Sequence, residues 1–248
     1  MLATALGLLL LGACKKNDEE SPSSGGTGTP TDCQATGTVT DIDGNVYPVV
    51  TIGSQEWMAR NLRATRYRDG SPIPNVTDNS AWSSLASGAW CNYLNDAAND
   101  SIYGKLYNWY AAATPELCPT GWHLPSDAEW KQMETTLGMP ANEVDLYNAS
   151  RGAAQNVGGK LKAATLWLAP NTGATDEVCF AAYASGDRED EDGAFIALGY
   201  MGSWWTATPW EPNPTEDAYY RFLNYQYGAI SRTADDMRTG RCVRCLRD

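Results

Sequence analysis

The stretch CPTGWHLPSDAEW, residues 118–130, decides the fold of this chain. Ser126 is followed three residues later by Glu129, which is the pattern of a capping box, where each side chain bonds the other residue's backbone N–H. Apolar residues then recur at helical spacing, and Gly138 supplies a residue of the type that ends many helices. The sequence therefore predicts a helix over residues 127–137.

Strand patterns lie on both sides of this helix. Two β-rich runs, residues 38–42 and 46–52, are joined by Asp-Gly-Asn, a tight-turn sequence that predicts an opening hairpin. We expect a second helix over residues 149–164. Short aromatic runs separated by turns then predict the strands of an antiparallel sheet, at residues 178–183, 194–205, 218–227 and 242–246. A hairpin, then helices, then strands indicates an α+β fold.

Residues 69–99 are rich in Ser, Asn, Asp, Pro and Gly and predict a long ordered loop. We expect its apolar side chains Trp82, Trp90, Tyr93 and Leu94 to hold this loop against the core. Long ordered loops are a common location for function.

Composition narrows the possible functions. The 248 residues carry a formal net charge of −12, which disfavours nucleic acid and anionic membrane surfaces because those partners need clustered Lys and Arg. His123 is the single histidine, so a zinc site with several imidazoles is excluded. His123 lies just before the predicted helix, where we expect a buried structural role for it.

The first residues resemble a bacterial lipoprotein signal. A short apolar run ends in Leu-Gly-Ala-Cys, and it is too short to span a bilayer, which takes about 20 apolar residues. We expect a signal peptide over residues 1–13, lipidation (palmitate) of Cys14 and a flexible tether over residues 14–32. An ordinary signal peptide is the alternative, since no Lys or Arg precedes the run. Early charged residues after Cys14 resemble a Bacteroidetes surface-export signal, and a merely soluble leader is an equal interpretation.

Cysteine usage agrees with export. Six cysteines remain beyond Cys14, an even number that favours three disulfides among roughly 15 possible pairings. A metal or redox use of Cys242 and Cys245 is a weaker interpretation, because one Cys-x-x-Cys pair alone is a poor zinc signal. The disulfide candidates are Cys33, Cys91, Cys118, Cys179, Cys242 and Cys245.

Six motifs in order resemble the Fibrobacter succinogenes major paralogous domain, a module of exported proteins in Fibrobacter and Bacteroidetes. They are DIDGNVY at 41–47, IGSQEWMARNL at 52–62, YGKLYNWY at 103–110, residues 118–130, GKLK at 159–162 and WWTAT at 204–208. The domain is expected over residues 33–248. The resemblance implies a C-type lectin-like fold, similar to that of formylglycine-generating enzymes, with an antiparallel sheet, two main helices, long ordered loops and disulfides.

The resemblance also bears on the cysteines. It implies a bridge between Cys118 and Cys245, and the pairs Cys179–Cys242 and Cys33–Cys91 then follow by elimination. Formylglycine-generating enzymes use a reactive cysteine pair in their C-terminal region, where Cys242 and Cys245 lie here. Their spacing differs and both have plausible disulfide partners, whereas catalysis needs an available thiolate. We therefore expect no enzyme activity.

Two loops are candidate ligand sites. The acidic run at residues 187–193 includes Asp190 and Asp192, whose oxygens suit Ca²⁺, although its spacing fails as an EF-hand and favours a solvated acidic loop. Trp-Glu-Pro-Asn at 210–213 contains the Glu-Pro-Asn tripeptide of mannose-type C-type lectins, and a Pro-rich turn is the simpler interpretation. Ca²⁺ is the one cofactor considered. The candidate metal ligands are Glu211, Asn213, Asp190 and Asp192, and the candidate ligand-binding residues are Trp205, Trp210, Glu211, Asn213, Tyr219 and Tyr220.

Together these observations predict a lipid-anchored outer-membrane protein, displayed at the cell surface, that acts as a binding or adhesion module for extracellular glycans or proteins. A structural or accessory subunit of a surface assembly, such as a fimbrial tip, is the alternative. A formylglycine-generating-type oxidase is the weakest interpretation.

Overall fold

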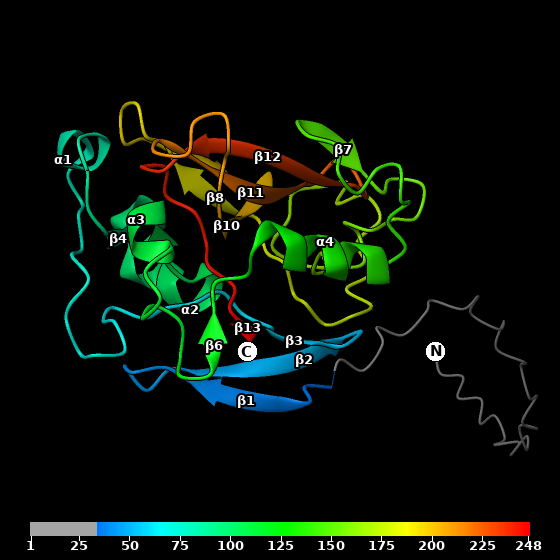
Figure 1. Ribbon diagram of the computed structural model, residues 1–248, viewed down its shortest axis with the longest axis horizontal. Coiled ribbons are helices and arrows are strands. Elements are labelled where there is room, and N and C mark those ends of the chain that lie inside the picture. Colours follow the sequence, from blue (N-terminus) through cyan, green and yellow to red (C-terminus); the bar gives the residue numbers. More distant parts are fainter. Residues whose placement is uncertain (1–33) are drawn as a thin grey trace, which may run out of the picture.

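The computed structural model describes residues 34–248, which form an α+β structure with mostly antiparallel strands (Figure 1). The predicted signal peptide, Cys14, the tether and Cys33 lie outside the described residues. Within residues 34–248, no helix has both the length and the apolar character needed to cross a bilayer.

A five-stranded sheet contains the predicted opening hairpin. Its strands, in the order β1-β2-β3-β13-β6, are β1 (Gly37–Thr40), β2 (Val46–Ile52), β3 (Gln55–Met58), β13 (Leu246–Arg247) and β6 (Trp122–His123). Asp41 shapes the hairpin turn, because its side chain accepts the backbone N–H groups of Asp43 at 3.0 Å and Asn45 at 2.9 Å. The last strand pairs with both β3 and β6, so it joins segments from the two ends of the described chain.

A four-stranded antiparallel sheet lies at the other side of the molecule (Figure 1). Its strands, in the order β10-β11-β12-β7, are β10 (Met201–Pro209), β11 (Asp217–Asn224), β12 (Ile230–Asp236) and β7 (Ala149–Arg151). Two short ribbons complete the strands: β4 (Trp90–Cys91) with β5 (Leu106–Tyr107), and β8 (Ser185–Arg188) with β9 (Phe195–Leu198).

The predicted central helix is confirmed as α4 (Asp127–Thr136). Both halves of the capping box are present, since Ser126 receives the backbone N–H of Glu129 and the Glu129 side chain receives that of Ser126. The other helices are α1 (Asn79–Ser83), α2 (Asp100–Tyr103) and α3 (Trp109–Ala112), with 3-10 turns at Tyr93–Asn95 and Ala97–Asn99. The expectation of two main helices is therefore wrong.

Helix α4 lies between the two sheets, and tryptophans carry the contact (Figure 1). The ring of Trp130 lies 5.0 Å from that of Trp57 on β3 and 6.4 Å from that of Trp204 on β10. Phe180 packs edge-on against all three. All four side chains are fully buried, so one aromatic core joins the helix to both sheets.

Buried ion pairs also attach α4 to the four-stranded sheet. Glu134 receives both terminal nitrogens of Arg151 at 2.8 and 2.9 Å and the Arg221 Nε at 2.6 Å. Asp127, two turns earlier on the same face of the helix, receives two nitrogens of Arg232 at 2.8 and 2.9 Å. Glu134, Arg151 and Arg221 have no exposed surface. The contact between α4 and the four-stranded sheet is therefore partly ionic rather than wholly apolar.

The segment expected to be a second helix is instead strand β7 followed by turns. Gly152 and Asn156 have φ values of +65° and +56°, which no helix accommodates. Lys162 turns inward, and its Nζ donates to the carbonyls of Thr172, Asn224 and Tyr227. Burial lowers the pKa of Lys162 to about 8.

The predicted C-terminal strands are confirmed in part. Strands β9, β10 and β11 lie within or near the expected runs, whereas residues 178–183 and most of 242–246 are irregular. The sequence predicts no strand at the positions of β8 and β12. The long loop is held by Trp82, Trp90 and Tyr93, which are buried, but Leu94 is 61% exposed. Leu94 has a positive φ of 54°, so its side chain leaves the core.

Candidate functional site: an aromatic shelf beside the β10–β11 loop

Three aromatic rings meet where β10 turns into β11. Trp210 stacks on Tyr147, with centroids 5.5 Å apart and planes 15° apart. The Tyr147 ring also meets Tyr219 edge-on at 6.2 Å. Tyr147 is 41% exposed, Trp210 is half-buried and Tyr219 is buried. We call Tyr147, Trp210 and Tyr219 the aromatic shelf.

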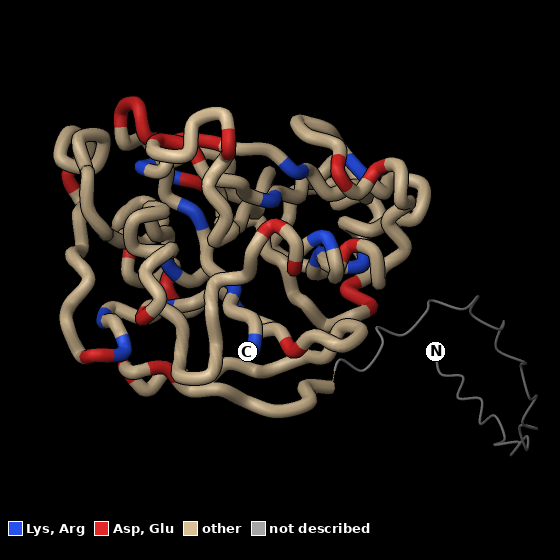
Figure 2. The backbone as a smooth tube through the Cα atoms, in the orientation of Figure 1, with Lys and Arg blue, Asp and Glu red and all other residues tan. Residues whose placement is uncertain are grey.

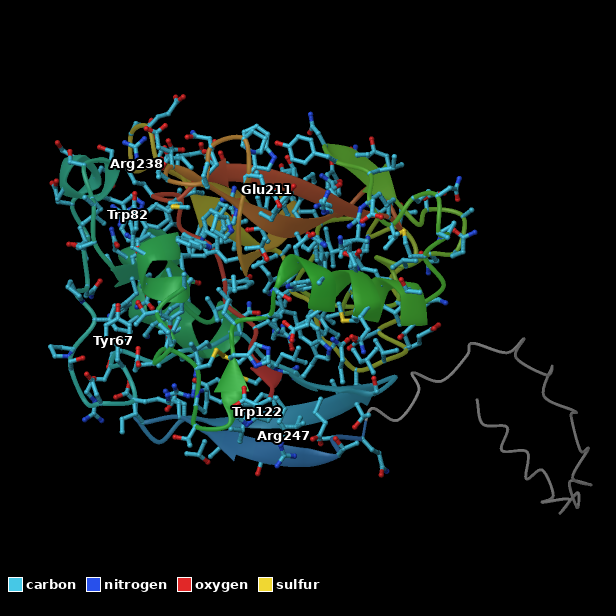
Figure 3. All side chains as sticks on the ribbon, viewed as in Figure 1. Tyr67, Trp82, Trp122, Glu211, Arg238 and Arg247 are labelled. Atoms are coloured by element: carbon cyan, nitrogen blue, oxygen red, sulfur yellow. A yellow bond between two sulfur atoms is a disulfide. The ribbon has the colours of Figure 1, made fainter. Side chains whose placement is uncertain are left out.

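Charged groups surround the aromatic shelf. The Tyr219 hydroxyl donates to Glu211 Oε2 at 3.0 Å, and the Arg232 guanidinium lies 4.2 Å from the Tyr219 ring centroid. Burial and the bond to Glu211 raise the pKa of Tyr219, so its hydroxyl stays a donor at neutral pH. Glu211 is exposed at the upper edge of the molecule (Figure 3). The shelf therefore presents an apolar face beside an accessible acceptor.

The loop that carries Trp210 is braced from within. The Asn213 side chain donates to Glu216 Oε2 and Asp217 Oδ2, both at 3.0 Å. The Trp210 N–H bonds the Asp217 carbonyl at 2.9 Å. Asn213 thus serves the loop's own structure, and its amide is directed at neighbouring carboxylates rather than outward to a ligand.

Two of the predicted ligand-binding aromatics lie elsewhere. Trp205 is fully buried, and its Nε1 donates to the Tyr107 carbonyl at 3.0 Å. Tyr220 packs edge-on against Trp205, and its ring centroid lies 3.6 Å from the Arg241 guanidinium. Because successive strand residues point to opposite faces, Tyr219 and Tyr220 are separated by the sheet. Trp205 and Tyr220 therefore do not lie on the surface that carries Trp210 and Tyr219.

Tyr147 is the shelf residue that the sequence did not indicate. It lies just before β7, and the adjacent Asn148 N–H bonds the Arg232 carbonyl at 2.9 Å. This hydrogen bond holds the segment of Tyr147 against β12, although Tyr147 and Trp210 are far apart in the sequence. A single Tyr in a polar segment offers no sequence pattern from which its contact with Trp210 could be predicted.

The acidic run is partly internal, not a fully solvated loop. Asp187 is buried beside Ser203 and Arg241, and burial raises its pKa. Arg188 is fully buried, with its guanidinium 4.4 Å from the Trp82 ring. The loop that follows carries acidic residues at the upper edge of the molecule (Figure 2).

The four predicted calcium ligands lie in two separate loops. Asp190 accepts from Arg238 at 3.4 Å and Thr239 at 3.3 Å, and Asp192 accepts the Ala194 N–H at 2.9 Å. In residues 34–248, no three His, Cys, Asp or Glu side chains are grouped so as to hold a metal ion.

The cysteines confirm one predicted pair and overturn others. Cys118 and Cys245 form a disulfide with a Cα–Cα distance of 5.9 Å. Cys242 is a free buried thiol that contacts Ser185 Oγ at 3.2 Å, so it does not pair with Cys179, which is disulfide-bonded. Cys91 is also free and buried within the core, so its predicted pairing with Cys33 is wrong.

Cys242 meets one requirement of the oxidase hypothesis, because its thiol is free. Burial raises its pKa to about 12, which disfavours the thiolate that such chemistry needs. Cys245, the other member of the Cys-x-x-Cys pair, is held in the disulfide with Cys118.

His123 bridges two carboxylates instead of being buried. Its Nδ1 lies 2.7 Å from Asp248 Oδ1 and its Nε2 lies 2.9 Å from Glu129 Oε1, and its side chain is 36% exposed. Partial burial lowers its pKa, but the two carboxylates outweigh this effect and leave the pKa raised above 6.5. The bridge ties β6 to the capping box of α4.

This bridge predicts a pH-dependent stability. A raised folded-state pKa adds stability that is fully present below about pH 6.5 and disappears as the pH rises through the folded pKa. We expect His123→Gln to destabilise the protein by up to about 1 kcal/mol at pH 5.5 to 6 and by less above pH 8. Urea denaturation of both proteins across this range measures the difference. A difference that grows with pH would contradict the bridge.

Comparison with known proteins adds one finding. No curated protein and no solved structure matches the chain. The sequence pattern of the Fibrobacter succinogenes major domain, however, matches residues 50–247. This range contains both sheets apart from β1 and the start of β2, together with α4 and the aromatic shelf. The chain therefore belongs to the Fibrobacter succinogenes major domain family.

Proposed function

We propose that this protein is an extracellular binding module that holds glycans on the aromatic shelf. The observation that carries the proposal is the partly exposed Tyr147 ring stacked on Trp210. Small-molecule sites combine apolar and aromatic surface with a few placed polar groups, and Glu211 beside Tyr219 supplies such groups. Sugars present both C–H faces and hydroxyls, so they suit this combination.

The location we propose for the module is the outer membrane, as a lipoprotein of Bacteroidetes type facing the cell surface. Support comes from the sequence: an apolar run ending in Leu-Gly-Ala-Cys, followed by a polar Ser/Gly/Pro-rich segment. An acyl chain on Cys14 would serve as the membrane contact. The C-type lectin-like fold is part of the same proposal, and the α+β arrangement around α4 supports it.

Binding is proposed in preference to catalysis. The thiol of Cys242 is fully buried and its pKa is high, whereas Tyr147 of the aromatic shelf is 41% exposed. A surface-assembly subunit is the second candidate. Strand β1 favours it, because this strand lies at the edge of its sheet among the described residues and is mostly exposed.

The aromatic shelf predicts a specific loss of binding. We expect Tyr147→Ala and Trp210→Ala each to weaken glycan binding by at least about tenfold. Each substitution removes one of the two stacked rings, and we expect the contact of the glycan with these rings to contribute about 1.4 kcal/mol or more, which corresponds to that factor. The measurement is a screen on an array of plant and bacterial polysaccharides, followed by titration of any hit with calcium and with chelator.

Tyr200→Ala is the matched control, because Tyr200 is 48% exposed and packs edge-on against Tyr225 away from the shelf. It should leave binding unchanged. Binding that persists in both shelf variants would overturn the proposed site. Binding lost with chelator and in Glu211→Gln would instead support a calcium-dependent site at Glu211.

A further inference from the structure

Unpaired positive charge is concentrated in one segment of this acidic protein. Most Lys and Arg side chains in residues 34–248 form ion pairs with carboxylates. Lys162, Arg188 and Arg244 are fully buried and donate chiefly to carbonyl oxygens. The solvent-accessible cations of these residues that form no such pair are Arg60, Arg63 and Arg68, all between β3 and the long loop.

Arg60 and Arg63 line the same cavity. It has a volume of about 220 Å³ and lies between the start of β2 and helix α2. Arg60 and Pro48 also border an adjoining cavity of about 310 Å³, where the Arg60 guanidinium lies 5.2 Å from the Tyr183 ring centroid. The two cavities share Pro48 and Arg60 in their walls, and we call this pair of adjoining cavities the arginine groove.

A third guanidinium, that of Arg244, lies near Arg60, and the Asp176 carboxylate in the wall of the larger cavity interacts with both. Arg244 is fully buried and donates to Asn61 Oδ1 at 3.0 Å and to the carbonyls of Met58 and Ala181. Burial and the neighbouring charge of Arg60 lower the pKa of Arg244 to about 9. An anion beside Arg60 would offset this repulsion.

The opposite wall of the groove has a different chemistry. Helix α2 contributes Asp100 and Ser101, and Asp100 is ion-paired to Lys105 at 2.5 Å. Val46 and Ile102, at the rim, are 58% and 41% exposed. Asp100 would repel a ligand that is anionic throughout, whereas it accepts hydrogen bonds from hydroxyl groups.

We propose that the arginine groove binds a carboxylate-bearing sugar, such as a uronic acid residue. The carboxylate pairs with Arg60 and Arg63, because a guanidinium matches the geometry of a carboxylate with two parallel hydrogen bonds. The ring hydroxyls face Asp100 and Ser101, and the apolar face of the sugar ring contacts Val46 and Ile102. An acidic peptide fits less well, because it offers fewer hydroxyl donors to Asp100.

The test is calorimetric titration of the 248-residue chain with trigalacturonate. The neutral galactose trisaccharide and inorganic sulfate are titrated in parallel. We expect trigalacturonate to bind at least about tenfold more tightly than either. Arg60→Gln and Arg63→Gln should each weaken trigalacturonate binding at least about tenfold. Arg68→Gln is the matched control, since Arg68 borders a separate cavity beside Ile42 and Pro119, and it should have no effect.

Any of the following results would contradict the proposal. Trigalacturonate binding that is absent, or unchanged in both arginine variants, would overturn the groove as its site. Equal binding of the neutral trisaccharide would overturn the carboxylate, and equal binding of sulfate would show that the groove holds a simple anion. Thermal unfolding of each variant checks that it is folded. The groove is separate from the aromatic shelf, so Trp210→Ala should leave trigalacturonate binding intact, and either proposal can fail alone.

Discussion

Replacing Glu134 by Gln is expected to lower the free energy of unfolding by about 3–5 kcal/mol. The substitution keeps the size of the side chain but removes the charge that Arg151 and Arg221 share at 2.6 to 2.9 Å. Both guanidiniums have no exposed surface. Arg221 keeps its ion pair with Asp127 at 2.8 Å, whereas Arg151 would remain charged without the carboxylate that neutralises it. The midpoint and slope of urea denaturation measure the loss.

Lys131→Gln on the same helix is the control for Glu134→Gln. Lys131 pairs at 2.9 Å with Asp145, whose side chain is 78% exposed, and at 3.4 Å with Asp127. The Lys131 side chain is itself 26% exposed, and pairs made by such accessible side chains contribute no more than about 1 kcal/mol. If both variants lose the same small amount, the buried network does not attach α4 to the sheet as described.

The second large effect is expected at the Cys118–Cys245 disulfide. Its cysteines are 127 residues apart in sequence, and closing a loop of that order constrains the unfolded chain by about 4–5 kcal/mol. The double variant Cys118→Ser with Cys245→Ser should lose about that much free energy of unfolding. Differential scanning calorimetry and urea denaturation both measure it.

Variants are preferable to a reductant here, because Cys179 is also disulfide-bonded and would be reduced as well. Cys91→Ala serves as the control, since its thiol is free and buried and its loss changes packing without opening a loop. A double variant no less stable than this control would show that the cross-link contributes little.

Local patterns predicted the parts of the fold that depend on neighbouring residues. The capping box of Ser126 and Glu129 predicted the start of α4, and the turn sequence Asp43-Gly44-Asn45 predicted the hairpin. The Cys118–Cys245 bridge came from family resemblance, not from spacing. In each case the determining contacts lie in a short stretch or in a motif that the chain shares with its family.

Long-range contacts explain the failures. Lys160-Leu161-Lys162 resembles the end of a helix, yet the Lys162 ammonium is stabilised inside the protein by carbonyls from distant segments. Tyr147 became part of the site only because β7 pairs with β12, which brings it to Trp210. The sequence singled out Trp210 and Glu211 as candidates together with Tyr220, but alternation along β11 places Tyr220 on the opposite face of the sheet from Tyr219.

The position of β13 has a consequence for the order in which the chain can fold. Residues 246–247 fill the space between β3 and β6, so these two strands wait for a partner that is synthesised long after them. A chain interrupted before residue 245 keeps an incomplete sheet and a Cys118 without its partner. Contacts so distant in sequence also slow folding. During biosynthesis one edge of β3 therefore remains unpaired until residues 246–247 have been made.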